Sequence, residues 1–479
     1  MAHARKDRNC GEPIRLAHIV IITSNMAGRI NATCELTRRL RAAGHEVTLC
    51  SPMDIGERVA AQGMDYLHLG SADRSEPVTG RGAAGRFRRF VALVGRLGTI
   101  RTVDERRNAA VESLDIDRFL ETMGRLDPDL YLIDIELPMQ VMAVSSSGTP
   151  VAVWTTMLSL WKRPGVPPLH TDIVPGRGWR GGRLGIEWAW MRFRVWKWLR
   201  AQRLRATRVG TDQMSVLRGV ADRTGFSIHR EAARYEWLIP FVYRTIPTLM
   251  FNARAIEFSH EPHPVCQYVG PVLNVGRRAA DADAEQLDVT RRLEQIYARR
   301  AAGKARTLIY CGFGGWHRGD DRAFFRRIVA AVGRNLEWEV VIGLGARVDP
   351  DELGALPPSV HVFGWAPQME VLAHADLAVH HAGISSINES VVSGVPMVVY
   401  PYDYGDTPGA AARVVYHGLG LRGDRTRDSA DDINRRIEQV LADPSFRRNV
   451  EAMQDRYAAY ERNNAAVKAV EALLSTGGR

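Results

Sequence analysis

Residues 364–412 read GWAPQMEVLAHADLAVHHAGISSINESVVSGVPMVVYPYDYGDTPGAAA, with small and polar residues between two short apolar runs. The first run, residues 377–379, is too short for a helix but long enough for a buried strand. The second run, VPMVVYP at residues 395–401, predicts the next strand, and a helix is expected to begin between them at Ser385 or Ser386. A strand, a helix and a second strand in this order indicate a βαβ unit and a parallel sheet.

The turn between this strand and its helix has the composition of an anion-binding site. Ala382 and Gly383 leave room for a ligand near the backbone, and the N–H groups of a helix start attract phosphate. His381 and the two adjacent serines add hydrogen-bond donors, and Glu389 is placed to accept hydrogen bonds from a sugar diol. The alternative is structural, because Ser386-Ile-Asn-Glu389 also fits a capping box in which Glu389 binds only the helix start.

The N-terminal half shows the same alternation of strands and helices. LAHIVIIT at 16–23, the turn SNMAGRIN at 24–31, a helical stretch and HEVTLCSP at 45–52 form another βαβ pattern. SHEPHP at residues 259–264 interrupts the alternation before it resumes. We therefore predict an α/β protein with two doubly wound, Rossmann-like domains that face each other across a cleft, over residues 1–265 and 266–450. A helical segment at residues 451–479 is expected to pack back on the first domain.

Composition narrows the class of protein. Of 479 residues, 45% are hydrophobic and 25% are charged, as in ordinary globular proteins. The N-terminus lacks the apolar core of a signal peptide, and no run of eighteen apolar residues occurs. The five cysteines are scattered and show no metal-like pairing. We therefore expect a cytoplasmic protein without bound metal. The net charge of +10 favours an anionic partner: nucleic acid, anionic lipid or a phosphorylated ligand.

Residues 364–412 closely resemble the nucleotide-sugar signature of the UDP-glycosyltransferase family, which consists of inverting enzymes with the two-domain GT-B fold. The family pattern W-x-P-Q, H-x-G-x-x-S/T-x-x-E and G-V-P occurs here in order, and GHEVTLCSP and YVGPV elsewhere also look like the family. The resemblance implies an N-terminal acceptor domain, a C-terminal domain for a UDP-sugar co-substrate, and no cofactor. By the same resemblance, seven of these residues would form the nucleotide site. Trp365 and Gln368 would contact the base, His381, Gly383, Ser385 and Ser386 would hold the phosphates, and Glu389 would bind the ribose.

Two positions depart from the family pattern. Many members have Asp or Glu followed by Gln after the last strand, where this chain has Gly405 and Asp406, so Asp403 or Asp406 is the candidate for binding the donor sugar. The family's first turn carries a histidine that removes the acceptor proton, and this chain has Arg29 there. Arginine stays protonated and cannot act as a base.

The aspartate that orients the histidine in the family matches Asp134. Glu136 lies two residues further on and shares its side of the strand. One hypothesis is that Asp134 or Glu136 takes the proton, with Arg29 paired to Asp134. The other is that Arg29 orients an acceptor that is already acidic. The structural alternative is a polar strand end with a salt bridge between Arg29 and Asp134.

Residues 186–208, IEWAWMRFRVWKWLRAQRLRATR, combine four tryptophans with seven Lys or Arg and one acid. At helical spacing an apolar stripe forms from Leu184, Trp188, Met191, Val195, Trp198 and Leu199. Such a helix suits an anionic membrane surface, and the basic stretch RFRRFVALVGRL at 86–97 favours the same reading. The alternatives are packing of the stripe into its own domain and nucleic-acid binding, which no motif accompanies.

These observations predict a metal-independent glycosyltransferase that moves a sugar from a nucleotide donor, expected to be UDP-linked, to an apolar or lipid-like acceptor with inversion. Two alternatives stay open. One is a catalytically silent GT-B subunit that binds nucleotide or lipid for a partner, and the other is a GT-B enzyme of the nucleotide-sugar epimerase type.

Overall fold

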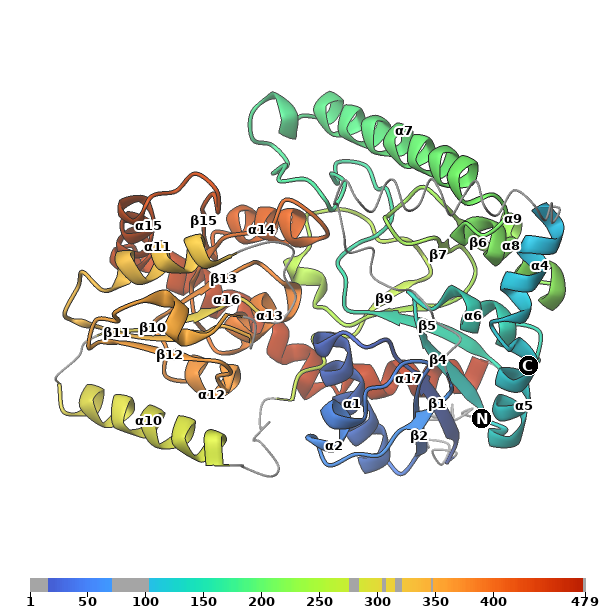
Figure 1. The fold of residues 1–479 in the computed structure, drawn as a ribbon, viewed down its shortest axis with the longest axis horizontal. Helices are drawn as coiled ribbons and strands as arrows, with labels where there is room; N and C mark the ends of the chain where they lie inside the picture. The colour runs from blue at the N-terminus through green and yellow to red at the C-terminus, as the bar shows by residue number, and fades with distance from the viewer. Residues whose placement is uncertain are drawn as a thin grey trace, which may run out of the picture.

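The computed structural model describes residues 16–70, 103–274, 284–303, 307–314, 321–345 and 348–476. They form two parallel sheets with helices around them (Figure 1), which confirms the predicted pair of Rossmann-like domains. The first sheet has the strand order β3 (Leu67–His68), β2 (Glu46–Ser51), β1 (His18–Ile22), β4 (Leu130–Asp134), β5 (Val151–Thr155), β8 (Thr248–Met250) and β9 (Cys266–Tyr268). The second has the order β12 (Val360–Phe363), β11 (Trp338–Gly343), β10 (Thr307–Gly312), β13 (Leu377–His380), β14 (Met397–Val399) and β15 (Gly420–Arg422).

Helices connect and cover these strands. The first domain contains α1 (Ala27–Ala42), α2 (Gly56–Ala60), α4 (Val103–Glu112), α5 (Ile116–Leu126), α6 (Pro138–Val144), α7 (Arg183–Arg208), α8 (Gln213–Thr224) and α9 (Ile228–Glu231). The second contains α10 (Ala284–Ala301), α11 (Arg322–Val332), α12 (Gln368–Leu372), α13 (Ile384–Val392), α14 (Thr407–Tyr416) and α15 (Ala430–Ala442), followed by α16 (Pro444–Arg462) and α17 (Ala465–Thr476). A short antiparallel pair, β6 (Ala232–Ala233) and β7 (Val242–Tyr243), lies near α7. No described helix is both long enough and apolar enough to cross a membrane.

The first sheet extends beyond the domain boundary expected at residue 265. Strand β9 pairs with β8, with Thr248 opposite Cys266, so residues 266–268 belong to the first domain. The sequence pattern missed this because a three-residue edge strand has no resolvable period. At the other end of the chain, Val467 and Val470 of α17 join the buried cluster of β1 and α1 (Figure 1), so the final helix packs on the first domain.

Buried polar contacts fix the two domains against each other. Arg413 of α14 donates to the Glu257 carboxylate at 2.6 and 2.8 Å, and both side chains are almost fully buried. Asn388 of α13 donates to Asn252 at 2.9 Å and accepts from the Tyr457 hydroxyl at 2.9 Å. Since unpaired buried polar groups are costly, these matched partners favour one relative placement of the domains.

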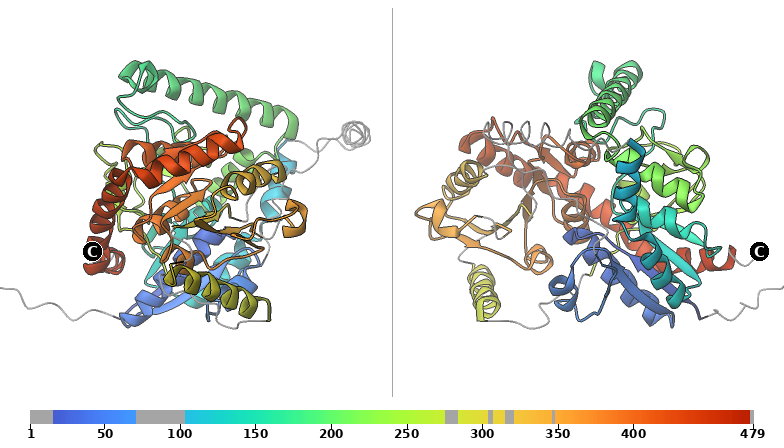
Figure 2. Two further views of the ribbon diagram at one scale, coloured as in Figure 1. Left: turned by 90° about the vertical axis from the view of Figure 1, so that its left-hand side faces the viewer. Right: turned by 45° about the vertical axis from the view of Figure 1, so that its right-hand side comes forward.

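Helix α7 lies at the outer edge of the first domain, at the top of Figure 1 and of both views in Figure 2. Its buried residues are Gly185, Ile186, Trp190 and Phe193. The stripe of Leu184, Trp188, Met191, Val195, Trp198 and Leu199 is exposed instead. The alternative in which this stripe packs into its own domain is therefore wrong. The basic stretch at residues 86–97 lies outside the described residues.

Candidate active site

The starts of α1 and α13 face each other where the two domains meet. A Cβ atom built on Gly28 of α1 would lie 2.7 Å from Oγ of Ser385 in α13. Each helix follows the first strand of a βα unit, β1 or β13, so both starts lie at carboxyl ends of parallel strands. Ligands of doubly wound folds bind at this edge, and the structure brings the two predicted halves of the site together.

The turn before α13 is fixed by its own backbone and by His380. The imidazole Nδ1 of His380 accepts a hydrogen bond from the Ala382 N–H at 3.1 Å. Ala382 has a φ of +62°, and Gly383 follows as the N-cap, so α13 begins at Ile384, one residue earlier than expected. Burial, and secondarily the charge of His381, lower the pKa of His380 to about 3. The imidazole is therefore neutral at physiological pH and can accept this bond.

The space beside Gly383 is taken by a side chain. A Cβ on Gly383 would lie 2.6 Å from Nε2 of His381, and a Cβ on Gly314 would lie 3.1 Å from Cε1 of the same ring. Any side chain at position 383 would therefore collide with the imidazole of His381, and ligand binding at this turn stays a prediction. Ser385 and Ser386 are half-buried in the first turn of α13. The predicted phosphate residues thus surround a single helix start.

Two consecutive hydrogen bonds link Glu389 to Gln368 and Gln368 to Tyr310. Nε2 of Gln368 donates to Oε2 of Glu389 at 2.5 Å, and the Tyr310 hydroxyl donates to Oε1 of Gln368 at 3.3 Å. The capping-box alternative is wrong, because the N-cap of α13 is Gly383 and it has no side-chain cap. The sequence missed Tyr310, whose inward position on β10 is set by sheet order alone. Trp365 is 44% exposed, so its ring is available for stacking.

Near the start of α1, Arg29 binds two carboxylates. Its Nη1 lies 3.0 Å from Oδ2 of Asp134, and its Nη2 lies 2.6 Å from Oε1 of Glu136. The hydroxyl of Ser24 donates to Asp134 at 2.6 Å and accepts from Arg29 at 3.0 Å. The predicted pairing of Arg29 with Asp134 is confirmed. Ser24 was missed, although its place directly after the first strand was a usable signal.

The two carboxylates differ in burial. The Asp134 side chain is completely buried, whereas 33% of the Glu136 side chain is exposed. Burial raises the pKa of Asp134, and the guanidinium of Arg29 works against that rise. Burial acts to lower the pKa of Arg29, but the two carboxylates raise it above its usual range. Arg29 is therefore a permanent cation held between them.

The candidate sugar-binding aspartates occupy different surroundings. Asp406 directly precedes α14, and burial raises its pKa, while Arg29 lowers it and Glu136 raises it. Asp406 is therefore within electrostatic reach of Arg29 and Glu136. Asp403 is exposed on the loop before it. Across the described parts of the chain, no group of three or more His, Cys, Asp or Glu side chains is arranged to hold a metal ion.

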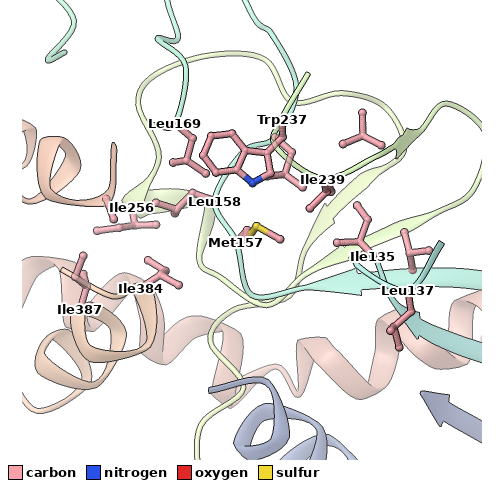
Figure 3. Close-up of a cluster of buried hydrophobic side chains, with 14 of the residues drawn as sticks. Ile135, Leu137, Met157, Leu158, Leu169, Trp237, Ile239, Ile256, Ile384 and Ile387 are labelled. Carbon is pink, nitrogen blue, oxygen red and sulfur yellow. The ribbon is translucent and has the colours of Figure 1, made fainter. Parts of the chain in front are cut away.

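Apolar side chains border this polar centre. Ile135 and Leu137, the neighbours of Glu136, belong to a buried cluster that also contains Met157 and Leu158 from the first domain and Ile384 from the second (Figure 3). Trp237, Ile239 and Leu169 continue the same cluster. Residues of both domains thus share one buried apolar cluster, which includes the two chain neighbours of Glu136.

Comparison with known proteins adds independent information. The family model described as "Erythromycin biosynthesis protein CIII-like, C-terminal domain" matches residues 326–473. The chain is 25% identical to oleandomycin glycosyltransferase of Streptomyces antibioticus, over 96% of this chain and 91% of that protein. It is 20% identical to zeaxanthin glucosyltransferase of Pantoea ananas, over 96% of this chain and 97% of that protein.

Solved structures resemble the whole chain. The glycosyltransferase VinC, solved in complex with dTDP, aligns with a TM-score of 0.61 at 16% identity, covering 96% of this chain and 100% of that one. The glycosyltransferase of kitacinnamycin aligns with a TM-score of 0.60 at 20% identity, covering 97% and 99%. At these identities the likeness establishes a shared fold.

Proposed function

Since the protein is a glycosyltransferase with the GT-B fold, and its relatives support the UDP-glycosyltransferase family, we propose that it transfers a sugar from a UDP-linked donor to an apolar, lipid-like acceptor with inversion. One observation carries this proposal. The predicted nucleotide turn at α13 meets the start of α1, the helix that carries Arg29, since a Cβ built on Gly28 would lie 2.7 Å from Oγ of Ser385. A donor held on one domain would therefore meet an acceptor held on the other.

The C-terminal residues suit a nucleoside diphosphate. The amides at the start of α13, together with His381, Ser385 and Ser386, would bind the phosphates and stabilise the charge that grows as the diphosphate leaves. Trp365 would stack on the base. Gln368 holds the Glu389 carboxylate at 2.5 Å, which orients it for the ribose hydroxyls. Because amides and a helix dipole supply the positive charge, we propose transfer without a metal ion, and Asp406 binding the donor sugar.

Between the two candidate bases, the geometry favours Glu136. A general base must reach the proton that it removes, and the partly exposed Glu136 meets this condition whereas the fully buried Asp134 does not. Arg29 and Asp134 are then positioning residues that hold Glu136 through the 2.6 Å contact to Nη2. The alternative in which Arg29 orients an acidic acceptor is disfavoured, because 5% of its side chain is exposed and two carboxylates already occupy it.

The proposed acceptor class rests on the apolar residues next to Glu136 in the chain. Ile135 and Leu137 belong, with Met157 and Ile384, to one buried apolar cluster (Figure 3), which supports an acceptor whose hydroxyl is attached to an apolar body. Two relatives that align over almost the whole chain are named for oleandomycin and zeaxanthin. Macrolides and carotenoids therefore belong in the acceptor panel.

Transfer by the purified chain tests the proposal. UDP-sugars and dTDP-sugars are each incubated with the acceptor panel, products are detected by mass spectrometry, and the anomeric configuration is read by NMR. We expect inverted product, and we expect Glu136→Gln to lower kcat by about 10²- to 10⁴-fold with unchanged UDP affinity. A retained configuration would overturn the inverting mechanism, and Glu136→Gln working at the parent rate would overturn the base assignment. UDP binding without transfer or donor hydrolysis would favour the silent-subunit alternative.

We also propose that the protein acts in the cytoplasm, at the inner face of an anionic membrane, through α7. The exposed stripe includes Trp188, 53% exposed, and Trp198, 49% exposed, and the arginines Arg192 and Arg203 are exposed on the same helix. Tryptophan with flanking arginine is typical of an interfacial helix. We expect flotation with vesicles containing anionic lipid and release as salt rises. Trp188→Ser with Trp198→Ser should abolish flotation; equal flotation with neutral vesicles, or flotation of the double variant, would contradict the proposal.

A further inference from the structure

A pocket of about 570 Å³ opens between α7 and the β6–β7 pair. Its lining residues are far in sequence from the nucleotide turn, and they belong to α7 and to the segment of β6 and β7, which lie well away from α13 in Figure 1. Its lining includes the arginines Arg194, Arg234 and Arg244, together with Val195 and Trp198 of α7. The Arg29 group and the nucleotide site use none of these residues.

The pocket carries more positive than negative charge. Arg194 is paired with Glu236 at 2.6 Å, and Glu236 also accepts from the backbone N–H of Lys162 at 2.7 Å. Among the residues that the structure describes, neither Arg234 nor Arg244 forms an ion pair with a carboxylate. Arg244 donates from Nε to the carbonyl oxygen of Ala232 at 3.3 Å, which leaves its two terminal nitrogens, together with the guanidinium of Arg234, to bind an anion. Guanidinium groups bind phosphate in a bidentate manner.

Further cations lie behind the pocket. Lys197 donates to the carbonyl oxygens of Trp237 and, at 2.8 Å, of Ile239. Burial and then the charge of Arg234 lower the pKa of Lys197 to about 7. Burial, Arg205 and Arg234 likewise lower the pKa of Arg218. Cations crowded in this way repel one another, and a bound anion relieves that repulsion.

The pocket is continuous with the exposed stripe of α7. Val195 and Trp198 line the pocket and also belong to the stripe. Arg234 additionally lies over the ring of Tyr235, with its Cζ 5.5 Å from the ring centroid. An occupant that satisfies both surfaces carries an anionic head in the pocket and an apolar part against Val195 and Trp198. Anionic phospholipid has this composition.

We propose that the pocket binds the phosphate of an anionic phospholipid headgroup on Arg234 and Arg244, while the α7 stripe contacts the acyl region. The inference rests on the proposed membrane contact of α7 for the source of the ligand. It goes beyond that contact, because it assigns recognition of one headgroup to two arginines rather than to diffuse charge.

Calorimetry with short-chain lipids below their micelle concentration tests the pocket separately from membrane contact. The probes are dihexanoyl phosphatidic acid, dihexanoyl phosphatidylcholine and inorganic phosphate. We expect phosphatidic acid to bind at least about tenfold more tightly than either other probe, and Arg234→Gln and Arg244→Gln each to weaken that binding by about tenfold. Arg203→Gln is the matched control, since it removes an equal charge from an exposed α7 position that does not line the pocket.

Each remaining outcome decides between explanations. Equal binding of inorganic phosphate and phosphatidic acid would overturn the lipid source, and equal weakening by Arg203→Gln would overturn the pocket in favour of diffuse charge. Unchanged binding in both pocket variants would also overturn it. Unchanged UDP affinity verifies that the variants are folded. If a Trp188→Ser, Leu199→Ser protein, whose two substituted residues belong to the exposed stripe but do not line the pocket, fails to float but still prefers phosphatidic acid, the pocket stands although membrane contact depends on the stripe.

Discussion

Nη1 of Arg29 lies 3.0 Å from Oδ2 of Asp134, and this contact joins the start of α1 to the end of β4 in the interior of the first domain. The two residues are 105 positions apart in the chain. At the position where the family resemblance implies a histidine base, this chain has Arg29, a fixed cation, and Glu136 is the accessible carboxylate beside it. The proposed base is therefore Glu136, two residues after Asp134.

Removing only Arg29 should destabilise the fold. Arg29→Gln leaves the buried Asp134 without its cation, and breaking such a buried pair typically costs about 3–5 kcal/mol. Arg29→Gln combined with Asp134→Asn removes both charges and should recover part of the loss. Urea unfolding of the two single variants and the double variant measures this coupling. Additive losses would show that the pair is not an energetic unit.

Closure of the cleft should be sensitive to Gly28. A Cβ at this position would lie 2.7 Å from Oγ of Ser385 but 3.6 Å from its Cβ. We expect Gly28→Ala to lower kcat/KM by about threefold to tenfold, roughly 0.7–1.4 kcal/mol. Alanine also favours helix α1, so a loss of folding would not explain the effect. In the Ser385→Ala background the same change should have little effect; an equal loss there would rule out this contact as the cause.

Single substitutions in the proposed nucleotide site should weaken UDP binding. His381→Ala and Glu389→Ala should each weaken UDP binding by about 1–3 kcal/mol, because each removes a charge-assisted or buried polar contact. Trp365→Ala should weaken it through lost stacking, and Trp365→Phe should retain part of the affinity. Trp179→Ala is the control, since Trp179 is 75% exposed and belongs to the other domain. Unchanged calorimetric affinity in the His381 and Glu389 variants would refute the site.

Acid should weaken the fold through His380. Its pKa falls from the ordinary 6.5 to about 3 in the folded chain, so the unfolded chain binds a proton that the folded one rejects. This group leaves stability unchanged above about pH 6.5 and lowers it as pH falls from there towards the folded pKa near 3, by about 2 kcal/mol at pH 5.

The comparison with His380→Asn isolates this effect. Asparagine keeps an acceptor for the Ala382 N–H but does not titrate. Urea unfolding at pH 7 and pH 5 should show a larger loss of stability in the parent than in the variant. Equal losses would mean that His380 does not titrate as its burial requires.

The sequence determined the local elements and the chemistry that each could carry. Short apolar runs with helices between them predict the strands β1, β13 and β14, because hydrophobic patterning reflects local geometry. The motif from Trp365 to Glu389 and the substitution of Arg29 for histidine are likewise visible without coordinates. The pairing of Arg29 with Asp134 was expected from the opposite charges of two positions that, by the family resemblance, lie side by side.

Only the tertiary structure decided which surfaces meet. The apolar stripe of α7 has the period of a helix that packs inward, yet Trp190 and Phe193 fill the domain contact and the stripe points outward. The bond between Tyr310 and Gln368 joins residues 58 positions apart, and the approach of Gly28 to Ser385 joins the two domains. The exposure of Glu136 but not of Asp134 likewise depends on what packs around them. Periodicity states that a face is apolar, but the partner that covers it is set by the packing of distant segments, which no local pattern contains.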